Sequence, residues 1–116
     1  MVRKTFSDQA SELLVSVIIP SFNRPKQTLR AVKSVLNQDY PFLEVIVIDD
    51  GSLPEVNLSI FGDAPAHVKC VLIRNEAPQG GNFARNRGAS LATGKYIAFL
   101  DDDDTWLPNK LALQRN

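Results

Sequence analysis

Four short runs of apolar, mostly β-branched residues alternate along the chain with segments of mixed polarity. The runs cover residues 15–19, 44–48, 69–73 and 96–100. Each run is too short for a helix and is bounded by proline, glycine, aspartate or asparagine, which is typical of strands, and the first run is expected to be a buried strand. The first run ends at Pro20 and the second at Asp49. We therefore predict four strands.

Two segments between these runs have the spacing of helices. From Pro25 to about Gln38, apolar residues recur at intervals of three and four, at Leu29, Val32, Val35 and Leu36. A second helix is predicted from about Asn82 to Gly94, with a small-residue face suited to packing on a sheet. That face comprises Ala84, Gly88, Leu91 and Ala92. Residues 53–68 predict at most a short helix over 56–61, and Pro108 marks the start of another helix.

The alternation of strand and helix predicts the fold class. Strand, helix and strand in this order imply right-handed crossovers and parallel pairing. The predicted fold class is therefore α/β, a Rossmann-like parallel sheet with flanking helices.

The chain has 116 residues, which is enough for one domain. We expect an N-terminal extension over residues 1–14 and the folded domain over residues 15–116. The helix that begins at Pro108 reaches Asn116 without a capping signal. We therefore expect the domain to be truncated at its C-terminus and to be the front portion of a longer protein. An unpartnered edge strand favours association of two copies, so a homodimer is expected.

Composition excludes several classes of partner. Thirteen basic and thirteen acidic residues give a formal net charge of zero, which argues against a nucleic-acid partner. Cys70 is the only cysteine and His67 the only histidine, so neither an internal disulfide nor a thiolate or histidine metal site is expected. Residues 1–14 contain no apolar run of signal-peptide length and the later apolar runs are strand-sized, so we expect neither export nor a membrane span. A cytoplasmic location fits these features.

Polar clusters follow all four predicted strands. They are Asn23-Arg24, Asp49-Asp50, residues 75–81 and residues 101–104. In an open parallel sheet, ligands bind beyond the carboxyl ends of the strands. We therefore expect a binding site at this edge of the sheet.

The four consecutive aspartates at 101–104 are the strongest of these signals. Aspartate favours turns and helix N-termini, so a solvated turn is one interpretation. The other is a metal site, because carboxylates that share an edge with Asp50 repel one another and a divalent cation relieves this repulsion. Ligands that are all oxygen select Mg²⁺, Mn²⁺ or Ca²⁺.

The remaining candidates carry weaker signals. Asp50, at the tip of a strand, can accept a hydrogen bond from a nucleobase or a ribose, although Asp49-Asp50-Gly51-Ser52 is also an ordinary turn sequence. Arg85 and Arg87 could neutralise a diphosphate, although arginines on a helix are more often plain solvated charges. Phe22 could stack on a base or belong to the core. Trp106 and Cys70 are interpreted as core residues.

Several motifs together point to a known family. They are residues 15–23, Asp49-Asp50-Gly51-Ser52, Ala84-Arg85-Asn86-Arg87-Gly88 and residues 99–104, followed by Trp106 and Pro108. In their order and spacing they resemble family 2 glycosyltransferases over about residues 15–116. This resemblance implies a GT-A fold, whose front half binds a nucleotide-sugar donor and whose back half binds an acceptor hydroxyl, on a saccharide or another molecule. Peripheral membrane association of the full-length protein is a further expectation.

The same resemblance implies roles for individual residues. Pro20, Phe22 and Asn23 would line the base and ribose pocket, and Asp50 would bind the base. Asp101, Asp102 and Asp103 would form the D-x-D type motif. Within it, Asp102 would lie near the ribose and Asp103 would bind Mn²⁺ or Mg²⁺ on the diphosphate. Arg85 would sit nearby and contact the nucleotide.

The sequence departs from the family pattern in two places, and two other functions are alternatives. The catalytic base of the family lies in a later segment, so we expect this chain to bind a nucleotide sugar but to transfer little of it. Residues 53–67 lack the helix usual after Asp-Asp-Gly-Ser. A receiver-like module that accepts a phosphoryl group with Mg²⁺ is one alternative, although its first strand should end in an acidic pair. A non-catalytic nucleotide-binding module is another.

Overall fold

The computed structural model describes residues 13–115. Within that range the chain forms a four-stranded parallel sheet in the order β3-β2-β1-β4. The strands are β1 (Val15–Ser21), β2 (Leu43–Asp49), β3 (Lys69–Arg74) and β4 (Tyr96–Phe99). Residues 1–12 of the predicted N-terminal extension, and Asn116, lie outside the described residues.

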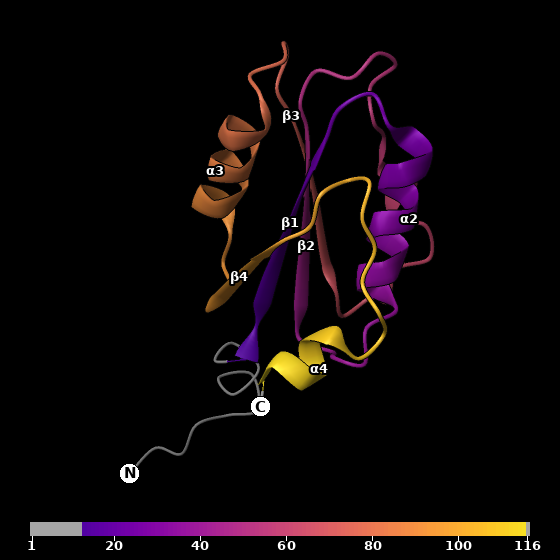
Figure 1. Ribbon diagram of the computed structural model, residues 1–116, viewed down its shortest axis with the longest axis vertical. Helices are drawn as coiled ribbons and strands as arrows, with labels where there is room; N and C mark the ends of the chain where they lie inside the picture. The colour runs from indigo at the N-terminus through magenta and orange to yellow at the C-terminus, as the bar shows by residue number, and fades with distance from the viewer. Residues whose placement is uncertain (1–12, 116) are drawn as a thin grey trace.

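The helices cover both faces of the sheet. They are α2 (Pro25–Leu36), α3 (Gly81–Leu91) and α4 (Lys110–Arg115), together with the 3₁₀ helix η1 (Leu58–Phe61). Figure 1 shows α2 and α3 on opposite sides of the sheet and α4 at one end, near the C-terminus. The predicted α/β class, with a parallel sheet and flanking helices, is confirmed.

The two central strands are apolar because both of their faces are covered. Every residue of β2 is buried, and so is every residue of β1 except Pro20. Such strands appear as continuous apolar runs rather than alternating patterns. On one face, Val32 and Val35 of α2 pack against β1 and β2. On the other, Ala84 of α3 packs against Ile18 and Ile48.

One expectation about side chains was wrong. Leu91 was expected on the packed face of α3 but is 44% exposed, and only Ala84 and Gly88 of that helix are buried. Strand β4, although apolar in sequence, is not a buried strand, and its residues Tyr96, Ile97 and Phe99 are exposed. The reason is topological, because β4 lies at the edge of the sheet and α3 packs mainly on β1 and β2.

The order of the strands indicates where along the sheet a ligand site is expected. The chain adds β2 and β3 on one side of β1 and then returns to add β4 on the other side. The connections therefore diverge between β1 and β4, which is where open parallel sheets bind ligands. Within residues 13–115, the helices are all too short or too polar to span a membrane.

Candidate functional site

A cavity of about 300 Å³ lies at the carboxyl ends of β1, β2 and β4. Seven of the eight predicted site residues line it, namely Pro20, Phe22, Asp50, Arg85, Asp101, Asp102 and Asp103. Asp50 and Asp103, which follow different strands, therefore share one pocket as predicted. Ser21, Arg24, Gly81 and Ala84 complete the lining.

Asp50 lines this cavity and is held by three hydrogen bonds. It is only 5% exposed. Its Oδ1 accepts hydrogen bonds from Asn75 Nδ2 and the Gln79 N–H, and its Oδ2 accepts one from the Gly80 N–H, each at 2.9 Å. Burial raises the pKa of Asp50, but these hydrogen bonds outweigh burial, so the pKa lies below its usual value. Asp50 is therefore a fixed anion that can accept a hydrogen bond from a ligand.

Asp102 lines the same cavity and lies beside the end of β1. Its Oδ2 accepts a hydrogen bond of 3.1 Å from the Phe22 N–H. Burial raises the pKa of Asp102, and the charges of Asp103 and Asp101 add to this. The Phe22 hydrogen bond and the Arg24 charge oppose the rise without cancelling it. Asp102 thus ties the loop after β4 to the loop after β1.

Three acidic side chains after β4 form a cluster of carboxylates, and two of them, Asp101 and Asp103, line the cavity. Oxygens of Asp101, Asp103 and Asp104 lie within 4.8 Å of one another, and all three residues are exposed. Asp101 Oδ1 pairs with Arg85 Nη2 at 2.8 Å. A set of carboxylate oxygens of this kind suits Mg²⁺ or Mn²⁺. The predicted ligand, Asp103, belongs to this cluster.

Arg24 lines the cavity, although the sequence prediction placed it only in a polar cluster at this edge and gave it no role of its own. Its Nη1 lies 2.9 Å from Asp103 Oδ2 and 3.5 Å from Asp102 Oδ1. The available signal was its position in the loop after β1, immediately before Pro25, the first residue of α2. Arg24, from this loop, and Arg85, from α3, therefore both pair with aspartates of the loop after β4.

Asn23 is the predicted site residue that does not line the cavity. Its backbone is left-handed, with φ of 53°. Its Oδ1 accepts a hydrogen bond of 2.9 Å from the Leu53 N–H, and its own N–H donates to Ser52 Oγ at 2.9 Å. Asn23 therefore joins the loop after β1 to the loop after β2.

Asp49 has the structural function that its turn sequence suggested. It is fully buried and accepts hydrogen bonds of 2.9 Å from the Ser52 and Val56 N–H groups. Arg74 Nη1 pairs with its carboxylate at 2.7 Å. Gly51, with φ of 82°, packs so closely on Pro78 that an added Cβ would lie 2.8 Å from the proline ring. This turn places Asp50 beside the cavity.

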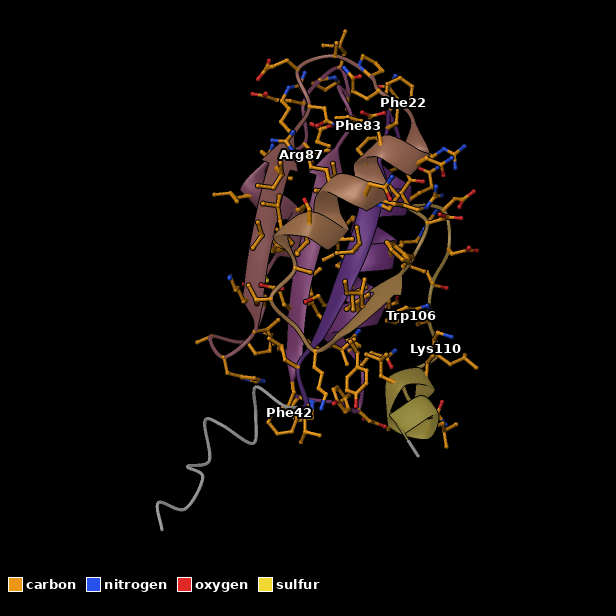
Figure 2. The ribbon with its side chains drawn as sticks, turned by 90° about the vertical axis from the view of Figure 1, so that its left-hand side faces the viewer. Phe22, Phe42, Phe83, Arg87, Trp106 and Lys110 are labelled. Carbon is orange, nitrogen blue, oxygen red and sulfur yellow. The ribbon has the colours of Figure 1, made fainter. Side chains whose placement is uncertain are left out.

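The aromatic residues divide between the site and the core. Phe22 is 45% exposed and lines the cavity, so it is available for stacking rather than buried in the core. Figure 2 shows Phe22 and Phe83 at the same end of the molecule, with Phe42 at the other end. Trp106 and Cys70 pack against the core as predicted. Lys110 Nζ lies 5.5 Å from the centre of the Trp106 ring.

Comparison with known proteins identifies relatives of this chain. The family model described as Glycosyl transferase family 2 matches residues 16–114. The chain is 38% identical over 103 residues to the UDP-Glc:alpha-D-GlcNAc-diphosphoundecaprenol beta-1,3-glucosyltransferase WfgD of Escherichia coli, covering 89% of this chain and 40% of that protein. It spans 36%, 14% and 40% of the length of three curated relatives to which it is 38–46% identical.

Solved structures share the fold. Crystalline S. aureus TarS 1-349 in complex with UDP superposes with a TM-score of 0.77 and 28% identity, covering 88% of this chain and 31% of that one. The mannosyltransferase PcManGT of Pyrobaculum calidifontis, in complex with GDP-Man and Mn²⁺, superposes with a TM-score of 0.67 and 25% identity, covering 79% and 28%. These neighbours have the GT-A fold, as predicted.

The family match also argues against a receiver-like module. Strand β1 ends in Ser21 rather than in the acidic pair that a receiver-like module would need. The match of the family model extends over almost all of the described residues, from the first strand into the last helix. The chain therefore belongs to glycosyl transferase family 2.

Proposed function

We propose that this chain is the nucleotide-sugar-binding portion of a glycosyltransferase. It would bind a nucleoside-diphosphate sugar with a divalent cation, for transfer of the sugar to an acceptor hydroxyl on a saccharide or another molecule. The observation that carries this proposal is the convergence of Asp50 and Asp103 on one cavity of about 300 Å³. Complexes of TarS with UDP and UDP-GlcNAc support a nucleotide sugar as the donor.

Each wall of the cavity suits one part of the donor. The half-exposed ring of Phe22 would stack on the base, beside Pro20, and Asp50 would accept a hydrogen bond from it. Asp102, within the same cavity, would accept a hydrogen bond from a ribose hydroxyl. Arg85, which lines the cavity and pairs with Asp101, would contact the diphosphate.

The carboxylate oxygens of the acidic cluster are suitable ligands for a divalent cation. Asp103 and Asp101 would hold Mn²⁺ or Mg²⁺, since both offer exposed carboxylate oxygens and line the donor cavity. When bound, the cation would neutralise the negative charge that develops on the departing diphosphate. The complex of PcManGT with GDP-Man and Mn²⁺ supports this assignment. Arg24 and Arg85 balance the same carboxylates in the protein alone.

Donor binding, rather than complete catalysis, is the activity we expect of the 116-residue chain. Removal of a proton from the acceptor hydroxyl needs a positioned base, and we expect that base in a later segment of a longer protein. Residues 15–116 would then be the donor-binding portion. The cytoplasmic location, the peripheral association of the full-length protein with membranes and the homodimer remain proposals of the same kind.

The experiment that tests this proposal is a calorimetric titration of the chain with UDP, GDP, CDP and dTDP sugars in the presence of Mn²⁺. The expected result is saturable binding of at least one donor, with little transfer to any acceptor in a parallel assay. If none of these donors binds, the proposed function is wrong. If the chain transfers sugar rapidly by itself, the expectation of a missing base is wrong.

A further inference from the structure

Arg87 lies outside the donor cavity but is connected to it through one side chain. It belongs to α3 and is half-buried. Its Nη1 donates a hydrogen bond of 3.1 Å to the Arg74 carbonyl and a second, short one to Asn75 Oδ1. Figure 2 shows Arg87 toward the same end of the molecule as Phe22. The guanidinium is therefore anchored to the backbone while it binds one atom of the Asn75 amide.

The Asn75 amide has only one orientation that satisfies its neighbours. Asn75 is 4% exposed, and its Nδ2 donates to Asp50 Oδ1 at 2.9 Å. If the amide turned over, its oxygen would face the Asp50 carboxylate and its NH₂ group would face Arg87. Two acceptors and two donors would then oppose each other in a buried place, where unpaired polar groups are costly. Arg87 therefore fixes which end of Asn75 faces Asp50.

The Asn75 amide in turn fixes which acceptor of Asp50 remains free. A carboxylate oxygen can accept two hydrogen bonds. Asp50 Oδ1 already accepts two, from Asn75 and Gln79, whereas Oδ2 accepts one, from Gly80. The remaining acceptor thus lies on Oδ2, and Asp50 lines the donor cavity. A ring N–H of a nucleobase, such as that of uracil, is the chemistry that matches it.

We propose that Arg87 is a positioning residue of the base pocket, which acts through Asn75 to present the free acceptor of Asp50 to the ring N–H of a nucleobase. The inference rests on the proposed function and adds a residue that does not touch the nucleotide. It implies that Arg87 contributes to recognition of the base but not to recognition of the diphosphate. Comparing a ligand that has a nucleobase with one that has only the diphosphate group can separate recognition of the base from recognition of the diphosphate.

The test compares Mn²⁺–UDP with Mn²⁺–pyrophosphate by calorimetry in the wild-type chain and in Arg87→Met. We expect Arg87→Met to bind UDP about tenfold more weakly, a loss of about 1.4 kcal/mol, with pyrophosphate affinity unchanged. Arg30→Met is the matched control, since Arg30 is exposed on α2; both ligands should bind it as they bind the wild type. Equal losses for both ligands in Arg87→Met, or no loss for UDP, would overturn the proposal.

Two further variants separate positioning from general support of the fold. In Arg87→Lys, an ammonium can still donate to Asn75 Oδ1, so we expect most of the UDP affinity to return. In the Asn75→Ala background, Arg87→Met should cause no further loss of UDP affinity relative to pyrophosphate, because the intervening amide is gone. The Asn75 side-chain amide resonance should shift in Arg87→Met and stay near its wild-type position in Arg87→Lys. An additive loss in the double variant, or an unchanged resonance in Arg87→Met, would contradict the proposal.

The outcomes for the wild-type chain distinguish this inference from the proposed function. If neither UDP nor pyrophosphate binds with Mn²⁺, the proposed function fails, and the inference fails with it. If the two bind equally well, the diphosphate site stands and the base pocket is wrong. If UDP binds more tightly and Arg87→Met leaves that preference intact, the proposed function stands and only the inference is wrong.

Discussion

Arg24 and Asp103 form an ion pair, with Arg24 Nη1 lying 2.9 Å from Asp103 Oδ2. Arg24 precedes the first residue of α2, whereas Asp103 follows β4, so the pair forms only because β4 lies beside β1 in the sheet. Arg24 pairs with a carboxylate that the proposed cation would also need. Arg24 and the cation should therefore compete for Asp103.

This competition predicts that Arg24→Gln binds Mn²⁺ more tightly than the wild type in the absence of nucleotide. Both side chains of the pair are about half exposed, and exposed pairs contribute about 0–1 kcal/mol. The expected gain in affinity is therefore modest, up to about fivefold. Electron paramagnetic resonance of free Mn²⁺ measures it. Arg30→Gln controls for the lost charge, and an equal gain in that variant, or none in Arg24→Gln, would show that the two groups do not compete.

The close contact of Gly88 in α3 with the sheet leads to a second prediction, on stability. A Cβ at this position would collide with Ile18 Cγ2 and lie 3.4 Å from Ile48 Cγ1. Gly88→Ala should therefore lower the free energy of unfolding by about 1–3 kcal/mol through overpacking, despite the better helix propensity of alanine. Urea denaturation measures the loss. Asn86→Ala, at an exposed position of the same helix, should lose nothing; equal stability of the two variants would mean that α3 packs less closely than described.

The buried carboxylate of Glu44 leads to a prediction of how the stability of the protein depends on pH. Its side chain is fully buried in β2 and accepts hydrogen bonds from Ser16 Oγ at 2.7 Å and from the Thr93 N–H at 2.9 Å, and Lys69 Nζ lies 3.1 Å from it. Burial raises the pKa of Glu44, but these partners outweigh burial and lower it below its usual value. The ionised form therefore stabilises the protein above the usual pKa of about 4.3, and this stabilisation is lost as the pH falls through the lower, folded-state pKa.

Glu44→Gln should accordingly cost about 2 kcal/mol of unfolding free energy at neutral pH, because a charged acceptor of buried donors is lost. The difference from the wild type should shrink as the pH falls below about 4.3. Urea denaturation across a pH series provides the test. Glu76→Gln, at an exposed position, is the control and should match the wild type throughout. A difference for Glu44→Gln that is as large in acid as at neutral pH would contradict the assigned pKa shift.

The predicted strands were found because their signals are local. Apolar runs that end at proline, aspartate or asparagine predicted β1 and β2 within one or two residues of their observed bounds. The exposed face of β4 could not be predicted in this way, since its run resembles that of a central strand and only the strand order places it at the edge.

The candidate site, too, was predictable only in part. The acids at strand ends were predictable, because the carboxyl ends of parallel strands share one edge. Their partners were not, since the pairing of Arg24 with Asp103 depends on β4 lying beside β1. The use of Asn23 in joining two loops depends on a left-handed backbone that its sequence neighbours do not specify.

The most direct test of the account measures UDP binding by calorimetry with and without Mn²⁺ in the wild type, in Asp103→Asn and in Asp63→Asn. Asp63 is exposed and outside the donor cavity, so Asp63→Asn is the matched control. We predict that Mn²⁺ tightens UDP binding by about tenfold or more in the wild type and in Asp63→Asn, and has no such effect in Asp103→Asn. An equal effect of Mn²⁺ in Asp103→Asn, or no effect in the wild type, would contradict the central claim that Asp50 and Asp103 serve one cation-dependent nucleotide site.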